Sequence, residues 1–379
     1  MKKLLSEVCT IQYGFPFDSA KFSDSDGMPL IRIRDVVRGY SETYTTEEYK
    51  SEYIVHENDL LIGMDGEFNI AKWGKTPALL NQRVCRLAPK DSIDKDYLFY
   101  FMPIALKRIE EKTPFVTVKH LSAKELNKIE IPVLPLEEQR KIAETLSKVD
   151  ELIAFRDQQL AKLDELVKAR FVEMFGNPIE NTMNWPKKLL RDITTKIGSG
   201  ATPKGGRESY PNAGVSLIRS MNVYDGQFLY KDLAHLTDEQ ATQLNGVTVE
   251  AEDVLVNITG ASVARSCVVP KDVLPARVNQ HVAIVRCNRE LLNPIFTNKM
   301  FINNEFKKAL LSIGESGGAT RQAITKKQLE ELSVVVPPLS IQNEFFTFSE
   351  CVDQQKQTVQ QSLEKLELMK KALMQEYFG

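Results

Sequence analysis

An internal duplication constrains the fold of this 379-residue chain more than any other feature of its sequence. Residues 124–136 read Lys-Glu-Leu-Asn-Lys-Ile-Glu-Ile-Pro-Val-Leu-Pro-Leu, and they match residues 327–339 without a gap. In the same register Gln139 matches Gln342, and the Phe-Gly pair at residues 175–176 matches the last two residues of the chain. Self-similarity at a fixed offset is the sequence signature of repeated structural units. We therefore expect a pseudo-two-fold internal repeat.

Each copy opens with a region in which strand and helix patterns are mixed. Short apolar runs bounded by Gly and Pro, as strands are, occur at residues 30–37, 59–64, 84–87, 254–258 and 282–285. Residues 96–111 and 293–311 have helical patterns instead. The fold class that we expect is therefore α+β, with one globular region in each copy.

Each copy closes with a long helix that carries an apolar seam. Apolar residues recur at spacings that alternate near three and four, which is typical of a coiled coil. The seam residues are Ile142, Leu146, Val149, Ile153, Leu160, Leu163, Val167, Phe171 and Met174 in the first helix, and Phe345, Phe348, Val352, Val359, Leu363, Leu366 and Leu373 in the second. Glu137 and Glu138 begin the first helix, and Gly176 with Pro178 ends it.

A lone amphipathic helix of this length cannot bury its seam, so we expect the two helices to pack antiparallel on each other and to separate the globular regions. The alternative is that each helix packs only against its own globular region. The expected order is a first domain at residues 1–136, a spacer helix at 137–176, a second domain at 177–339 and a C-terminal helix at 340–379.

Composition indicates a folded, soluble protein, because 42% of the residues are hydrophobic and 26% are charged. We expect a cytoplasmic location, since no apolar run approaches the length of a membrane span and the N-terminus lacks a signal-peptide pattern. The five cysteines lack metal-ligand or disulfide spacing, so we expect reduced, mostly buried thiols and no metal. The net charge of −2 does not indicate nucleic-acid binding, which at this charge would have to be local or shared with partners.

Residues 135–146, Pro-Leu-Glu-Glu-Gln-Arg-Lys-Ile-Ala-Glu-Thr-Leu, lead a helix that ends in Phe-Gly. This segment resembles the conserved central region of type I restriction-modification specificity subunits. Residues 337–342 resemble the C-terminal conserved region of that family, and residues 188–220 look like the start of one of its target recognition domains. The resemblance covers essentially the whole chain. One departure is that Ser340, Ile341 and Asn343 replace the charged residues of the first helix start.

The resemblance implies a non-catalytic subunit that reads a bipartite site in double-stranded DNA, with one half read by each recognition domain. It implies that the helices set the spacing and bind two modification (methyltransferase) subunits, with restriction subunits joining through the complex. No cofactor is expected on this chain, and S-adenosylmethionine is expected on the modification subunit. Adding or deleting heptads in the helices should change the gap between the half-sites. Paired seams within one chain favour a monomer when it is alone.

Two alternatives remain open from the sequence. The chain could be a coiled-coil scaffold whose globular domains bind proteins, or it could be the specificity subunit of a related system in which one partner both methylates and cleaves. A methyltransferase is disfavoured, because residues 293–296, Asn-Pro-Ile-Phe, lack the second proline of the amino-methyltransferase loop and no glycine-rich cofactor loop follows a strand.

Base edges are read by side chains with paired donors and acceptors, such as Arg for guanine and Asn or Gln for adenine, usually from loops. Candidates of these kinds in the first copy are Tyr13, Phe15, Arg32, Arg34, Asp65, Asn69, Asn81, Gln82, Arg83, Thr117 and Lys119. In the second copy they are Ser199, Thr202, Lys204, Arg207, Arg219, Asn257, Thr259, Asn279, Gln280, His281 and Arg321. Loops at residues 198–207 and 314–321 are suited to phosphate contacts. For each candidate the alternative is a solvated turn, and the recurring Asn-Gln pairs also fit turn chemistry.

Overall fold

The computed structural model describes residues 1–112, 119–203, 210–315 and 322–379. It divides into two compact units, the first formed by residues 1–157 and 361–379 and the second by residues 158–360. Two helices of 40 residues each contribute a segment to both units, namely α5 (Leu136–Phe175) and α10 (Leu339–Phe378). The C-terminal segment of the chain therefore belongs to the unit that begins at Met1.

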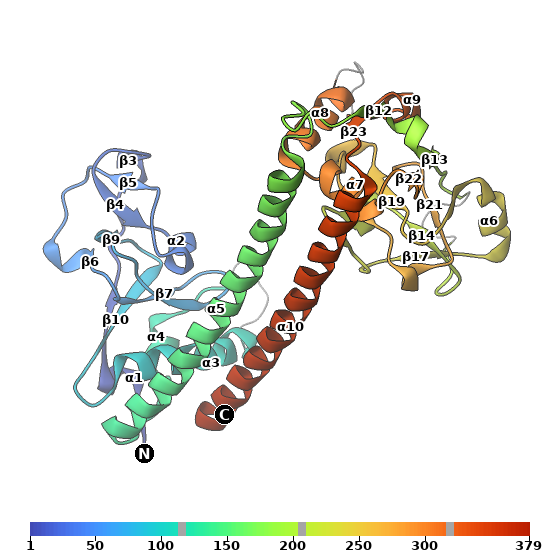
Figure 1. Cartoon of the computed structure of the whole chain (residues 1–379). Coiled ribbons are helices and arrows are strands. Elements are labelled where there is room, and N and C mark those ends of the chain that lie inside the picture. Colours follow the sequence, from blue (N-terminus) through green and yellow to red (C-terminus); the bar gives the residue numbers. More distant parts are fainter. Residues whose placement is uncertain (113–118, 204–209, 316–321) are drawn as a thin grey trace. The chain divides into compact units, whose positions relative to one another are not determined.

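The first unit combines two sheets with a helical layer (Figure 1). One sheet has the order β2-β10-β7-β8, and the other has the order β3-β5-β4-β9-β6. A short pair, β1 with β11, joins the two ends of the globular region. In chain order these elements are β1 (Lys2–Leu4), α1 (Leu5–Val8), β2 (Cys9–Tyr13), β3 (Phe22–Ser23), β4 (Met28–Ile31), α2 (Ile33–Arg38), β5 (Tyr44–Thr45), β6 (Ile54–Val55), β7 (Leu60–Gly63), β8 (Asn69–Lys72), β9 (Ala78–Leu80), β10 (Val84–Pro89), α3 (Lys95–Lys112), α4 (Ala123–Asn127) and β11 (Glu130–Pro132).

The second unit has the same plan. Its main sheet has the order β13-β22-β19-β20, its second sheet has the order β17-β14-β21-β18, and β12 pairs with β23. In chain order the elements are β12 (Lys187–Leu189), β13 (Thr194–Ser199), β14 (Val215–Ile218), β15 (Val223–Tyr224), β16 (Gln227–Phe228), β17 (Ala234–Leu236), α6 (Asp238–Gln243), β18 (Thr248–Val249), β19 (Val254–Asn257), β20 (Ser266–Val268), β21 (Ala276–Val278), β22 (Val282–Cys287), α7 (Pro294–Phe301), α8 (Asn304–Glu315), α9 (Lys326–Glu330) and β23 (Ser333–Val335).

The repeat expected from the sequence is confirmed by the strand pairing. In each main sheet the last long strand, β10 or β22, lies between the first strand and an antiparallel hairpin. In each second sheet one pair is parallel, β4 with β9 and β14 with β21. The two copies therefore share a topology as well as a sequence pattern, and the α+β class is confirmed.

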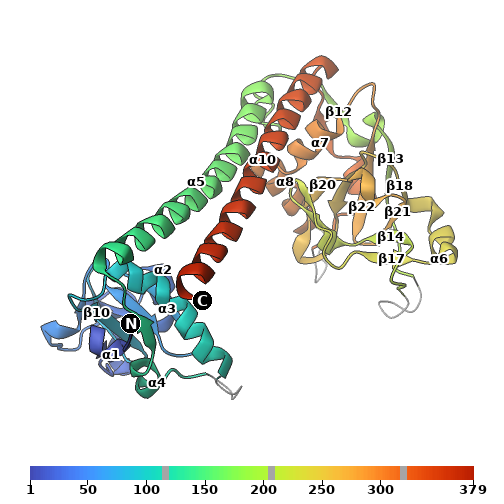
Figure 2. The ribbon, with the colours of Figure 1, turned by 90° about the horizontal axis from the view of Figure 1, so that it is seen from below.

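The segments of α5 and α10 run antiparallel within each unit, and they lie side by side in both views (Figure 1, Figure 2). In the first unit Lys370 pairs with Asp150 at 2.6 Å, and Arg156 Nε donates to Ser362 Oγ at 3.1 Å. In the second unit Lys356 pairs with Asp164, and Arg170 Nη2 pairs with Glu344 at 3.2 Å. Residue numbers thus rise along α5 as they fall along α10. This confirms the expected antiparallel pair.

All the predicted seam residues are buried or half-buried. The apolar core of the first unit takes Ala143 and Leu146 from α5 and Phe378 from α10, and the core of the second takes Phe171 from α5 and Phe345 from α10. The alternative in which each helix packs only against its own globular region is therefore wrong. Each globular region packs against both helices.

The start of each long helix is fixed by one buried glutamine. Gln139 Oε1 accepts a hydrogen bond from the backbone N–H of Asp94 at 2.8 Å, and its Nε2 donates to the carbonyl oxygens of Ser92 and Leu134. Gln342 makes the equivalent three bonds, to the N–H of Asn293 at 2.9 Å and to two backbone carbonyls. Both side chains are 0% exposed. The two residues matched by the repeat therefore have the same structural role.

The end of α5 is set by Gly176, whose φ of +72° lies in the left-handed region. A Cβ at this position would lie 2.3 Å from Thr182 Oγ1, so a side chain is excluded as well as strained. The Gly176 N–H donates to the Val172 carbonyl at 2.8 Å and closes the last turn. The predicted stop signal is thus confirmed.

Two sequence expectations were wrong in detail. The apolar run at residues 30–37 is a strand only as far as Ile31, because the Asp35 carboxylate accepts the Arg32 N–H at 2.8 Å and starts α2. The helical pattern at residues 293–311 is two helices, because the Asn303 side chain accepts the Glu305 N–H at 3.1 Å and begins α8. In both places a local capping bond outweighs the periodicity of the apolar residues.

The five cysteines are free, and all except Cys351 are buried. Burial raises the pKa of Cys9 and Cys267 to about 12 and that of Cys287 to about 11. Such thiols remain protonated and unreactive at neutral pH. Among the described residues, no cluster of His, Cys, Asp or Glu has the geometry to hold a metal ion. No helix within the described ranges is long and apolar enough to cross a membrane.

Candidate nucleic-acid interface

The same end of the main sheet carries a polar cluster in each unit. In the first unit the residue after β7, Met64, donates its N–H to the Arg83 carbonyl and accepts from the Leu121 N–H at 2.7 Å. In the second unit Ile258 donates to the His281 carbonyl and accepts from the Ile324 N–H at 2.8 Å. These bonds join three segments in each unit. They are the end of β7 or β19, the turn before β10 or β22, and the segment before α4 or α9. The framework is therefore equivalent in the two copies.

In the first unit this framework brings together Asp65, Arg83 and His120. His120 Nδ1 lies 2.5 Å from Asp65 Oδ1, and Arg83 Nε lies 3.6 Å from Asp65 Oδ2. Arg83 Nη1 approaches the two ring nitrogens of His120 at 3.2 and 3.3 Å. The Arg83 and His120 side chains are about half exposed, at 51% and 46%. The cluster is thus linked internally and open to solvent.

In the second unit the framework brings together Thr202, Thr259, Gln280 and His281. His281 Nδ1 lies 2.5 Å from Thr259 Oγ1, and its Nε2 lies 3.1 Å from Gln280 Nε2. Thr202 Oγ1 donates to Gln280 Oε1. All four were predicted from the sequence, and the structure gathers them at one place. Unlike those of the first cluster, the four described side chains include no carboxylate or arginine.

The paired asparagines before these turns are structural. Asn81 is 7% exposed, and its Oδ1 accepts the Gln82 N–H at 2.8 Å. Asn279 is 6% exposed, and its Oδ1 accepts the His281 N–H at 3.0 Å. Both side chains shape the turn that presents the following residues. This turn chemistry is the alternative to contact with bases that the sequence left open. The exposed Gln82 and Gln280 remain candidates for contact with bases.

Asn257 is also internal, in place of the base contact expected from the sequence. It is 0% exposed, and its Nδ2 donates to the Ser220 carbonyl at 2.9 Å. Tyr13 packs against the apolar core of the first unit, and burial raises the pKa of its hydroxyl. Asn69 is half-buried and donates to the Glu67 carbonyl at 3.1 Å. These three side chains support the fold, so reaching a base would require them to leave their packing.

The other described candidates lie at or near the surface. Phe15 packs edge-on against Phe17 with ring centroids 5.0 Å apart, and Lys119 Nζ donates to the Glu110 carbonyl at 2.9 Å. Arg219 donates to the Asp232 carbonyl and lies over the Tyr210 ring. Arg32, Arg34 and Ser199 are exposed, the second beside Asp35 at 3.7 Å. Thr117, Lys204, Arg207 and Arg321 lie outside the described residues, as do large parts of the two loops expected to contact phosphates.

Sequence reasoning did not select His120 or Arg86. His120 aligns with Ala323, at a position where the copies differ next to matching helix caps at Ser122 and Thr325. Arg86 pairs with Asp59 at 3.1 Å, and the equivalent Arg286 pairs with Asp253 at 2.8 Å. The Arg–Asp pairs are structural and could have been found from the repeat. His120 becomes notable only once its contacts are known.

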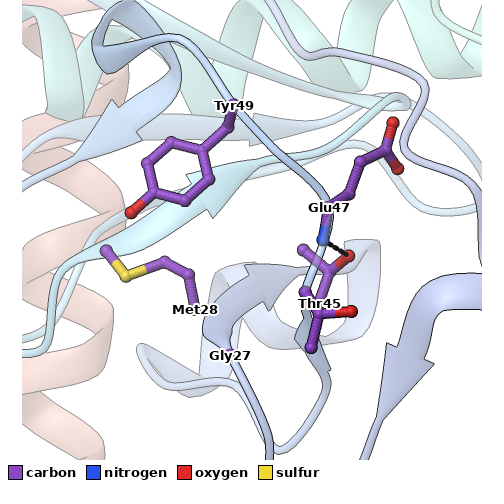
Figure 3. Close-up of a pocket in the computed structure, with 6 residues that line it drawn as sticks. Gly27, Met28, Thr45, Glu47 and Tyr49 are labelled. Carbon is purple, nitrogen blue, oxygen red and sulfur yellow. Dashed lines mark hydrogen bonds between the residues drawn. The ribbon is translucent and has the colours of Figure 1, made fainter.

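A shallow hollow lies elsewhere on the first unit, beside β4 and β5 (Figure 3). It is lined by Gly27, Met28, Thr45, Thr46, Glu47 and Tyr49. The Glu47 carboxylate already accepts the Asp18 N–H at 2.7 Å, and its own N–H donates to Thr45 Oγ1 at 3.2 Å. Because its one ionisable carboxylate is engaged, we assign no ligand to this hollow.

Comparison with known proteins identifies relatives along the whole chain. The model of the family described as the type I restriction modification DNA specificity domain matches residues 1–165 and again residues 183–368. The chain is 30% identical to the type I restriction enzyme EcoBI specificity subunit of Escherichia coli, over 93% of this chain and 80% of that protein. It is 22% identical to the MjaVIII specificity subunit of Methanocaldococcus jannaschii, over 91% and 87%.

Solved structures share the fold. The S subunit of a type I restriction-modification system from M. genitalium superposes with a TM-score of 0.59 at 15% identity, over 100% of this chain and 96% of that one. A chain from a study of the assembly and conformational transition of the type I system gives the same TM-score at 17% identity, over 100% and 97%. At these identities the likeness concerns the fold alone.

Proposed function

We propose a function for this chain, which belongs to the type I restriction-modification DNA specificity family and has DNA sequence specificity as its role. The two matches to the family model coincide with the two copies of the repeat. We infer that each copy reads one half of a bipartite DNA site. The observation that supports this most directly is the pair of polar clusters at equivalent ends of the two main sheets, which differ in chemistry between the copies.

The different clusters are what an asymmetric bipartite site requires. A cluster with arginine and carboxylate groups and one with hydroxyl, amide and imidazole groups present different donors and acceptors to base edges. Identical clusters in a two-fold repeat would favour a palindrome instead. We therefore propose that the first copy and the second copy specify different half-sites.

We propose that the paired helices bind the modification subunits. Large apolar side chains are exposed along them, including Leu152 and Phe155 in the first unit and Leu166 and Val172 in the second. Leu152 and Phe155 lie three residues apart on α5 and so share one face of the helix, and an exposed apolar patch on one face marks a candidate protein interaction site. The first helix start presents Glu137, Glu138 and Arg140, whereas the second presents Ser340 and Asn343, so the two docking sites are not chemically identical.

Catalysis in the proposed complex belongs to the partner chains. In this account methyl transfer and cleavage occur on partner chains in the cytoplasm, and S-adenosylmethionine binds to the modification subunit. Restriction subunits join through the assembled complex. The chain is a monomer before assembly, because its two seams are already paired with each other. With a net charge of −2 it binds DNA weakly when alone.

Genome-wide methylation mapping tests this proposal. A host without endogenous methylation would express the cognate modification subunit with and without this chain. We expect a split motif, two short specified sequences separated by a fixed gap, that is methylated only when the chain is present. The modification subunit alone is the control. A methylation pattern independent of this chain would contradict the proposal and favour a protein-binding scaffold.

A further inference from the structure

We propose that Arg83 reads a guanine in the first half-site and that Asp65 and His120 hold its guanidinium in the reading position. This inference rests on the proposed function and adds to it the residue that reads a base, the base that is read, and the two residues that position the reading side chain. It comes from the geometry of the first polar cluster and from its absence at the equivalent place in the second unit.

The backbone at Arg83 is held in a conformation that its residue type disfavours. Its φ is +73°, in the left-handed region that non-glycine residues rarely adopt. The surrounding turn fixes it, because the Arg83 carbonyl accepts the Met64 N–H at 2.9 Å and the Val84 N–H donates to the Asn81 carbonyl at 3.2 Å. Strain maintained by its surroundings is typical of functional positions. Here it fixes where the arginine side chain leaves the turn.

The side chain is held by two neighbours. The Asp65 carboxylate lies against Nε at 3.6 Å and accepts from His120 Nδ1, while Arg83 Nη1 lies 3.2 and 3.3 Å from the two ring nitrogens of His120. Each of the three groups thereby contacts the other two. Within the described part of the chain, Arg83 Nη2 has no hydrogen-bond partner. The guanidinium is therefore oriented on one side and free to donate on the other.

This arrangement favours a base contact over a phosphate contact. The Asp65 carboxylate beside Arg83 repels an approaching phosphate and offsets the arginine charge, so the cluster gains little from the charge of the DNA backbone. An oriented guanidinium fork instead matches the adjacent O6 and N7 acceptors of guanine in the major groove. The Asp65 carboxylate lies on the Nε side of the Arg83 guanidinium, whereas a guanine would accept hydrogen bonds on the opposite side. The carboxylate therefore does not oppose guanine binding as it opposes a phosphate.

At the three equivalent positions the second unit carries other residues. His281 occupies the position of Arg83, Thr259 that of Asp65 and Ala323 that of His120, as the matching backbone bonds and bridges show. Guanine recognition through this geometry is therefore confined to the first half-site. The equivalent position of the second half-site is served by Gln280 and His281 and is expected to show a different base preference.

Five variants of the complete complex test the inference by methylation mapping, with the base frequency recorded at every position of the motif. Arg83→Gln removes the charge, and Arg83→Lys keeps the charge but loses the fork. Asp65→Asn removes the negative charge that helps to hold the Arg83 side chain, and Asp65→Glu keeps that charge as the conservative control. His281→Ala is the matched change in the second unit. Hydrogen exchange of β7 and β10 establishes that the Arg83 and Asp65 variants are folded, and exchange of β19 and β22 does so for His281→Ala.

We expect both Arg83 variants to relax one guanine of the first half-site by roughly tenfold to a hundredfold and to leave the second half-site unchanged. Asp65→Asn should relax the same guanine by less, and Asp65→Glu should restore part of the preference. Unchanged base preference, or equal weakening at every position with Arg83→Lys near normal, would overturn the inference in favour of a phosphate contact. Absence of any chain-dependent motif in the parent complex would instead contradict the proposed function.

Discussion

Replacing Phe175 with alanine is expected to destabilise the second unit by about 3–5 kcal/mol. Phe175 is the last residue of α5 and is 0% exposed. Its ring packs against those of Phe296 and Phe345 with centroids 4.6 and 5.4 Å apart. Its loss would leave a cavity where α5, α7 and α10 meet. Hydrogen exchange should show faster exchange in α7 and β22, while β7 and β10 of the first unit remain protected.

Phe155→Ala is the matched control for this prediction, because it makes the same change on the same helix. Phe155 is 61% exposed and belongs to the first unit. Its replacement should change stability by less than about 0.5 kcal/mol. If the two variants exchanged alike in α7 and β22, the aromatic cluster would not hold the helix pair to the second globular region.

Lengthening both long helices by three heptads is expected to widen the gap in the DNA site by about one helical turn. The insertions would be placed between residues 157 and 158 of α5 and between residues 360 and 361 of α10, where the chain passes between units. Twenty-one residues add about 32 Å of helix at 1.5 Å per residue. Successive like faces of the duplex lie about 34–36 Å apart, so both domains can again meet the same groove.

The control for the helix insertion is a single heptad in each helix. It keeps the seam in register but adds about 10 Å, which moves one domain to a different face of the duplex. Methylation should then be reduced or lost, and any motif that remains should keep both half-sites with a changed gap. With three heptads, methylation mapping should recover both original half-sites with about ten more base pairs between them. Altered half-site sequences, or an unchanged gap, would contradict the view that the helices set the spacing.

The features that the sequence predicted best are those that depend on periodicity or on the repeat. The seams followed from apolar spacing, since an unpaired stripe of that length cannot remain in water. The equivalence of Gln139 and Gln342 followed from alignment of the two copies, and the structure explains it by three matching hydrogen bonds. Such features depend on residues close together in the sequence, or they occur in both copies of the repeat.

The features that the sequence did not predict depend on contacts between distant residues. Asn257 has the chemistry of an adenine-reading side chain, yet it serves the backbone of Ser220, which lies 37 residues away. His120 has no sequence neighbour that marks it, and its role appears only where it meets Asp65 across 55 residues. Residue type restricts what a polar side chain can recognise, whereas burial and tertiary contacts decide whether it faces DNA.

The most direct test of the central claim is to exchange residues 188–339 for the corresponding segment of another family member and to map methylation in the complete complex. The account predicts a split motif in which one half changes to that of the donor, while the other half and the gap remain as in the parent. A motif in which both halves change, or in which neither does, would contradict the assignment of one half-site to each copy of the repeat.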